Sequence, residues 1–185
     1  MNRMCAARPR EPDRDCDLCP RLAAFREENR RANPDWFNGP VPAFGSLDAP
    51  LLIVGLAPGL KGANLTGRPF TGDYAGDLLY ATLRKYGFAK GQYDKRPDDG
   101  LRLIDCRVTN GVRCVPPQNK PVGQEINACR PFLTDEIKLM PNLRVILSLG
   151  LVSHSTVLGA LDEKRSAWKF AHGALHGLSS GITLA

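Results

Sequence analysis

The feature that most constrains the fold is a short apolar run that ends in a glycine-rich loop. The run is Leu51–Gly55, and it follows Pro50. An apolar run of this length without polar alternation is typical of a strand buried on both faces, as in a parallel sheet. Two further strands are predicted over 103–110 and 143–149, and the stretch 175–184 can begin another.

Segments with helical spacing separate these strands. In the segment 77–86, Leu78, Leu79 and Leu83 are expected to face the core. The alternation predicts a three-layer α/β/α fold with a mainly parallel central sheet, whose active site lies beyond the carboxyl ends of the strands. The predicted helices span 21–31, 77–86, 124–140 and 151–161.

Length and composition fit one domain. The chain has 185 residues, of which 43% are hydrophobic, which is enough for one core and too little for two ordinary domains. Charges and prolines crowd the first residues, so we expect a flexible tail over 1–15 and a single domain over 16–185. The sequence has neither a signal peptide nor an apolar run long enough to span a membrane, so we expect a cytoplasmic protein.

The net charge gives a weak indication of the partner. A formal charge of +6 favours a polyanion such as nucleic acid, although a plain solvated surface explains such an excess equally well. Neither a Walker sequence nor GxGxxG occurs, so no nucleotide cofactor is expected.

Four of the six cysteines are spaced like metal ligands. Cys16 and Cys19 form a C-x2-C pair, and Cys114 and Cys129 form a second, wider pair. In a reducing compartment such pairs favour a tetrathiolate site over disulfides. Zinc and iron-sulfur clusters both accept four thiolates, and the wide second pair favours a cluster. Ordinary cysteine without a ligand role is the alternative, and it is the assignment for Cys5 in the tail and for Cys106 in a predicted strand.

The glycine-rich loop 56–76 carries candidate catalytic residues at the mouth of the sheet. Phe70 can stack on a planar ring, and Asp73 can orient or deprotonate a water molecule. From composition alone, a residue such as Phe70 is more often a core residue, and one such as Asp73 is more often the N-cap of the following helix.

Three motifs together resemble a known family. They are the string GLAPGLKGANLTGRPFTGD at 55–73, the string TNGVRCVPPQNKP at 109–121, and the cysteine quartet. The combination is similar to the B-type (family 5) branch of the uracil-DNA glycosylase superfamily, from about Cys16 to Gly181. The resemblance implies a DNA base-excision repair hydrolase that cleaves the N-glycosidic bond of uracil, with other deaminated bases as further substrates. It would act on DNA, without a nucleotide cofactor, and as a monomer.

The resemblance also implies roles for individual residues. Asp73 would position or activate the attacking water, Phe70 would stack beneath a flipped base, and Asn110 would hydrogen-bond the Watson–Crick edge of that base. Leu56 stands where A-type relatives carry an acidic residue, so Asp73 would supply the carboxylate. The residues that would shape the pocket floor with their backbone are Gly55, Ala57, Pro58 and Gly59.

Ligands for a cofactor and for the DNA backbone follow from the same resemblance. The four cysteines, Cys16, Cys19, Cys114 and Cys129, would hold a structural [4Fe-4S] cluster, with zinc as the alternative. Basic residues in or beside the loops are expected to meet DNA phosphates, and they are Arg68, Arg113, Lys120 and Arg130.

The family usually continues into a strand and a His-Pro-Ser-type motif, which would lie beyond Ala185. The histidine of that motif would stabilise the departing uracil. His154, His172 and His176 precede it, and we expect them to be structural or surface residues. An alternative function is therefore a truncated, non-catalytic iron-sulfur DNA-binding remnant. A third is a zinc-stabilised α/β hydrolase of unknown substrate.

Overall fold

The computed structural model describes residues 8–185, so the first seven residues of the expected tail, and with them the assignment of Cys5, lie outside the described part. The helices are α1 (Pro20–Ala32), α2 (Ala63–Thr66), α3 (Tyr74–Lys85), η1 (Pro117–Asn119), α4 (Gly123–Lys138), α5 (Leu151–Ala160) and η2 (Arg165–Ala167). The strands are β1 (Phe44–Gly45), β2 (Leu51–Gly55), β3 (Ala89–Lys90), β4 (Arg102–Leu103), β5 (Cys106–Asn110), β6 (Val145–Ser148), β7 (His176–Gly177) and β8 (Thr183–Leu184).

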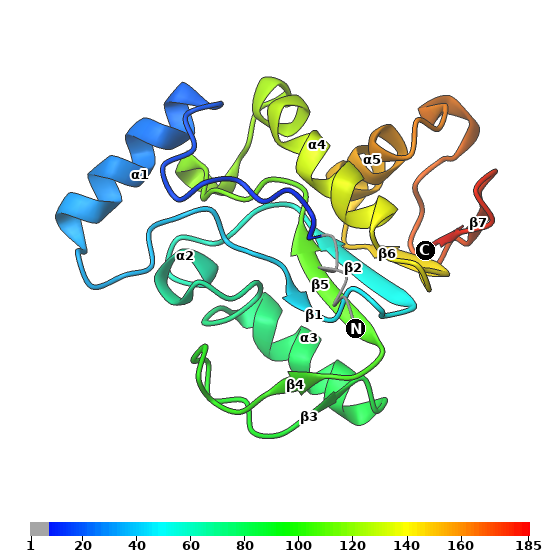
Figure 1. The fold of residues 1–185 in the computed structure, drawn as a ribbon, viewed down its shortest axis with the longest axis horizontal. Helices are drawn as coiled ribbons and strands as arrows, with labels where there is room; N and C mark the ends of the chain where they lie inside the picture. Colours follow the sequence, from blue (N-terminus) through cyan, green and yellow to red (C-terminus); the bar gives the residue numbers. More distant parts are fainter. Residues whose placement is uncertain (1–7) are drawn as a thin grey trace, which may run out of the picture.

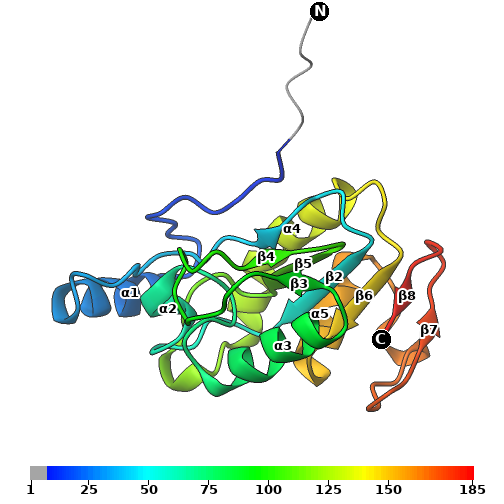
Figure 2. The ribbon, with the colours of Figure 1, turned by 90° about the horizontal axis from the view of Figure 1, so that it is seen from below.

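The main sheet is mostly parallel. Within residues 8–185 its strand order is β1-β5-β2-β6-β8-β7, in which β5, β2, β6 and β8 run parallel and the two outer strands run antiparallel. Figure 1 shows this sheet between helices, and Figure 2 shows β8 and β7 beyond β6. The predicted α/β fold is confirmed.

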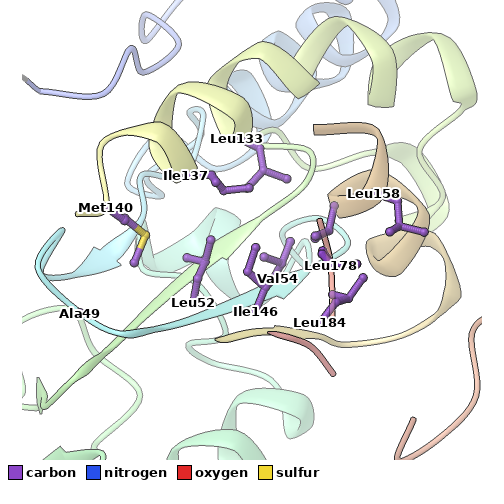
Figure 3. Close-up of a cluster of buried hydrophobic side chains, with 11 residues drawn as sticks. Ala49, Leu52, Val54, Leu133, Ile137, Met140, Ile146, Leu158, Leu178 and Leu184 are labelled. Atoms are coloured by element: carbon purple, nitrogen blue, oxygen red, sulfur yellow. The ribbon is translucent and has the colours of Figure 1, made fainter. Parts of the chain in front are cut away.

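Helices cover both faces of the sheet, with α4 and α5 on one side and α3 on the other (Figure 1). The side chains of β2 alternate between the two faces. Leu52 and Val54 pack in the cluster that contains Leu133 of α4, as Figure 3 shows, whereas Ile53 packs in the cluster that contains Tyr80 of α3. Both sides of this strand are therefore buried, which explains why its sequence is apolar throughout.

Two predicted strands differ from the observed ones. The stretch 103–110 is broken near Asp105, whose φ is 52°, so β5 joins the main sheet while β4 pairs with β3 in a separate two-stranded sheet. The stretch 175–184 forms a hairpin of β7 and β8 rather than one strand. Left-handed backbone of this kind favours a turn over continuous pairing.

The predicted inner face of α3 is partly wrong. The helix begins at Tyr74, three residues earlier than expected, and Tyr80 and Leu83 face the core, whereas Leu78 is 61% exposed. The earlier start comes from Asp73, whose side chain caps the helix.

Residues 8–15 lie against the domain instead of forming part of a free tail. The Arg10 guanidinium lies over the Phe132 ring at 5.5 Å from its centre, and the carboxylate of Glu11 is 3.6 Å from the guanidinium of Arg113. The ordered part of the chain therefore begins before Cys16. Among the helices of residues 8–185, none is long and apolar enough to cross a membrane.

Candidate active site

A cavity of about 610 Å³ opens at the carboxyl ends of β2, β5 and β6. This is the edge where an open parallel sheet is expected to bind its ligand, and the volume is in the range of small-molecule sites. The lining residues are Gly55, Leu56, Ala57, Pro58, Gly59, Phe70, Asp73, Ala75, Leu78, Leu79, Thr82, Asn110, Asn119, Leu147 and Leu149. The structure thus brings together Asp73 and every residue predicted to bind the base.

Gly55 lets two of these residues meet. It ends β2 directly beside Asn110, which ends β5. A Cβ atom at Gly55 would collide with the ring of Phe70 and with Oδ1 of Asn110. Because glycine lacks that atom, an aromatic ring and an amide from two separate segments approach the same point.

Asn110 has an unsatisfied polar atom. Its side chain is buried, with 3% of the residue exposed, and its Oδ1 finds no hydrogen-bond partner among residues 8–185. A buried polar atom without a partner costs free energy, so its persistence at the wall of a cavity suggests a ligand that supplies the missing hydrogen bond.

Phe70 adopts a strained backbone conformation, with a φ of 51°. For a bulky residue this left-handed conformation is uncommon and costs free energy, and it persists only where the surroundings impose it. The strain falls on a residue whose ring lines the cavity.

Asp73 has two different carboxylate oxygens. Oδ1 accepts a hydrogen bond of 2.9 Å from the backbone N–H of Gly76 and so caps α3. Oδ2 lies close to Gly59 and Gly62, where an added Cβ atom would come within 2.9 and 2.6 Å of it. This second oxygen has no hydrogen-bond partner among the described residues. Capping and a role in the cavity are therefore compatible.

The sequence prediction missed the side walls of the cavity. Leu78, Leu79 and Thr82 line it from α3, and Leu79 also packs against the core cluster that contains Tyr80. Asn119 lines it from η1, where its φ is 57°. The Pro-Pro-Gln-Asn sequence before Lys120 was the available signal for a turn at that place.

All four predicted ligand cysteines line a second, small cavity, together with apolar residues such as Leu22 and Phe132. The backbone N–H of Arg113 donates to Sγ of Cys129 at 3.3 Å. No three Cys, His, Asp or Glu side chains within residues 8–185 converge closely enough to hold a single metal ion.

Burial disfavours the thiolate form of three of these cysteines. It raises the pKa of Cys19 to about 11 and that of Cys114 to about 12, and the neighbouring Cys129 thiol adds to both shifts. The pKa of Cys129 itself is also raised by burial. A metal group held here would have to displace protons from its ligands.

The predicted contacts of Arg68 and Arg113 with DNA phosphates are wrong, because both side chains are buried. Arg68 is 4% exposed and forms a bidentate pair with Asp99. Arg113 is 1% exposed, and its Nη2 lies 2.6 Å from Glu136. Lys120 is exposed beside the cavity residue Asn119, and its phosphate contact stays a prediction.

None of the three histidines lines the cavity. His154 is buried, with the rings of Phe170 and His176 each 5.6 Å from its own ring centre. Nε2 of His176 lies 3.0 Å from the carbonyl oxygen of Lys169. These positions fit the structural roles predicted for these two histidines.

The site and fold match a described family. Residues 42–180 fit the family model described as the uracil DNA glycosylase superfamily. This match covers most of the chain and includes every residue of the cavity wall. The chain therefore belongs to the uracil-DNA glycosylase superfamily.

The relatives that it resembles over about 90% of its length are type-5 uracil-DNA glycosylases, which form one branch of that superfamily. The type-5 uracil-DNA glycosylase of Thermus thermophilus is 43% identical over 172 residues, covering 90% of this chain and 78% of the relative. The type-5 enzyme of Mycobacterium bovis is 41% identical over 179 residues, covering 91% of this chain and 66% of the relative. A type-4 uracil-DNA glycosylase of Pyrobaculum aerophilum is 33% identical over 152 residues, covering 82% of this chain and 63% of the relative.

Proposed function

We propose that the chain hydrolyses the N-glycosidic bond between uracil and deoxyribose in DNA. The observation that carries this proposal is the convergence of Asp73, Phe70 and the unpaired Oδ1 of Asn110 on one cavity. Excision of a base needs a carboxylate, a stacking ring and an amide that hydrogen-bonds the flipped base, and the cavity has all three. The type-5 relatives carry the same activity in their names.

Each residue has a distinct task in this reaction. The ring of Phe70 stacks on the extruded base, and the amide of Asn110 pairs with its edge, where it can satisfy both a carbonyl and an imide N–H of uracil. Oδ2 of Asp73 orients the water that attacks the sugar carbon, or stabilises positive charge on the sugar, while Oδ1 stays bonded to α3. The carboxylate is thus held in place before substrate arrives.

Other deaminated bases are further proposed substrates. A cavity of about 610 Å³ is larger than one pyrimidine ring requires, so a two-ring base can enter the same space. Its walls from α3 are apolar apart from Thr82. Among the polar side chains of the cavity, only Asn110 has a buried oxygen without a hydrogen-bond partner within residues 8–185, so we assign base selectivity mainly to it.

The test is strand cleavage of a uracil-containing oligonucleotide after alkali treatment, with Asp73→Ala as the control. We expect breakage at uracil by the wild-type chain and none by the variant. A folded wild-type chain that binds the oligonucleotide without breaking it would contradict the proposal and favour the non-catalytic alternative.

We also propose that Cys16, Cys19, Cys114 and Cys129 hold a [4Fe-4S] cluster with a structural role. Their four thiols line one apolar cavity, and an N–H donor points at Cys129 as in iron-sulfur sites. Zinc sites commonly use two tight C-x2-C pairs, whereas Cys114 and Cys129 lie far apart along the chain, and this spacing favours a cluster over zinc. The cluster would supply structure only, and no step of the hydrolysis passes through it.

To test whether the protein holds this cluster, we would purify it anaerobically and measure its visible absorption. We would also measure its iron, sulfide and zinc content. We expect a coloured protein that loses its iron on Cys114→Ser and keeps it on Cys106→Ser. Cys106 is a matched control, because it is also buried but lies in another part of the core. A colourless protein with one zinc ion would identify zinc instead.

A further inference from the structure

A buried ion pair lies beside the loop that carries Phe70 and Asp73. Nη1 and Nη2 of Arg68 donate to Oδ1 and Oδ2 of Asp99 at 2.8 and 2.7 Å, and the two side chains are 5% and 0% exposed. The two parallel hydrogen bonds fix orientation as well as distance. A buried ion pair often adds little net stability, so stability alone does not explain its presence here.

Both charged groups are fully engaged, and they join two segments. Nε of Arg68 donates to Oγ1 of Thr71 at 2.8 Å, inside the loop 66–73. Asp99 also accepts hydrogen bonds from the backbone N–H groups of Asp94 and Leu101, at 2.9 and 3.1 Å. The pair thus ties the loop before α3 to the connection between β3 and β4. Three aromatic rings surround the guanidinium, at 5.3 to 5.7 Å, and they belong to Phe44, Tyr80 and Tyr93.

Two of these rings also hold the strained backbone. The hydroxyl of Tyr80 donates to the carbonyl oxygen of Pro69 at 2.6 Å, and that of Tyr93 donates to the carbonyl oxygen of Phe70 at 3.4 Å. Phe70 keeps its positive φ within this set of contacts. A conformation of this cost persists because its neighbours determine it.

We infer that Arg68 and Asp99 are positioning residues for the base-binding cavity. They hold the loop 66–73 so that the Phe70 ring lines the cavity and Asp73 stands at the start of α3. Neither residue lines the cavity itself. The inference rests on the proposed function, because it concerns the geometry of that reaction.

Arg68→Lys tests this, with Arg107→Lys as a matched control. Each substitution keeps a positive charge and removes a guanidinium from a buried pair; Arg107 is 7% exposed and lies 2.6 Å from Glu136, away from the loop. We would measure the melting temperature, the single-turnover rate of uracil excision, and the affinity for uracil-free DNA. Both variants should melt at a lower temperature. Arg68→Lys alone should lose rate, by about tenfold or more, because small misplacements of catalytic groups are costly.

Affinity for uracil-free DNA should be unchanged in both variants, since neither arginine reaches the surface. A weaker affinity with a smaller salt dependence for Arg68→Lys would make Arg68 a phosphate contact and overturn the inference. Equal excision rates for the two variants, measured well below their melting temperatures, would also overturn it.

Tyr93→Phe covers the case in which Arg68→Lys does not fold. It removes only the hydroxyl that bonds the Phe70 carbonyl oxygen, so we expect normal folding and a several-fold lower rate. An unchanged rate would overturn the inference. A wild-type chain that excises no uracil would remove the proposed function and this inference together, whereas an active wild type with an unaffected Arg68→Lys would remove the inference alone.

Discussion

One carboxylate oxygen of Asp73 caps the N-terminus of α3, and the other lies beside the cavity. Asp73→Asn keeps an oxygen acceptor for the cap but loses the charge, so we expect a nearly unchanged melting temperature and a severe loss of excision. Asp73→Ala should lose excision as well and, in addition, about 1 kcal/mol of stability, as for other N-caps. Thermal melting alongside the excision assay separates the two roles. Equal stability of both variants would contradict the capping role.

The charge of Asp99 also has a measurable consequence. Burial raises the pKa of Asp99, but the hydrogen bonds from Arg68 and from the Asp94 and Leu101 N–H groups outweigh it, so this pKa lies below the usual range for aspartate. A carboxyl group with a lowered folded-state pKa adds stability that is fully present above its unfolded pKa of about 3.9, and that is lost as pH falls through the folded value.

Asp99→Asn should therefore be less stable than wild type by a constant amount between about pH 6 and about pH 8, and the difference should shrink only in acid. Denaturant unfolding at several pH values checks this. A stability difference that already falls between pH 8 and pH 6 would contradict the assignment of a low pKa.

At the scale of elements, the end of β2 sets the width of the cavity. Gly55→Ala would place a methyl group against Phe70 and Asn110. We expect a loss of excision of about a hundredfold, because both base-binding side chains must move. Gly123→Ala is the control, since a Cβ atom there meets nothing within 4 Å and Gly123 does not line the cavity. Comparable loss in both variants would show that the effect is not local.

The strands that carry the site were predictable because their signal is local. Leu51–Gly55 is apolar throughout, and the rule that ligands bind at the carboxyl ends of parallel strands then places the cavity. The inner face of α3 was predicted wrongly at Leu78, because Leu78 and Tyr80 both suit a core by composition. Which one faces inwards depends on the start of the helix at Asp73.

The roles of the arginines were not predictable in the same way. Arg68 and Asp99 are 31 residues apart along the chain, with α3 and β3 between them. Arg113, in the loop after β5, and Glu136, in α4, are 23 residues apart. No local sequence pattern shows such pairing. A loop arginine that forms a buried ion pair therefore cannot be distinguished by sequence from one that contacts a DNA phosphate.

At the scale of the whole molecule, the cysteine quartet joins the start of α1 to α4 and to the loop after β5. Removal of the proposed cluster by chelation should lower the melting temperature and speed tryptic cleavage within α1, whose arginines include Arg21 and Arg26. Limited proteolysis of treated and untreated protein checks this. Equal cleavage rates would contradict a structural role for the cluster.

The wide separation of the four cysteines also bears on biosynthesis. Cys16 and Cys19 leave the ribosome roughly a hundred residues before Cys129, which at ordinary elongation rates of about 5 to 20 residues per second is a delay of about 5 to 20 s. During that interval the thiols of Cys16 and Cys19 are on the nascent chain before the fourth proposed ligand, Cys129, has been synthesised. Production of a correctly assembled protein should therefore depend on how reducing the cell is while the chain is still being translated.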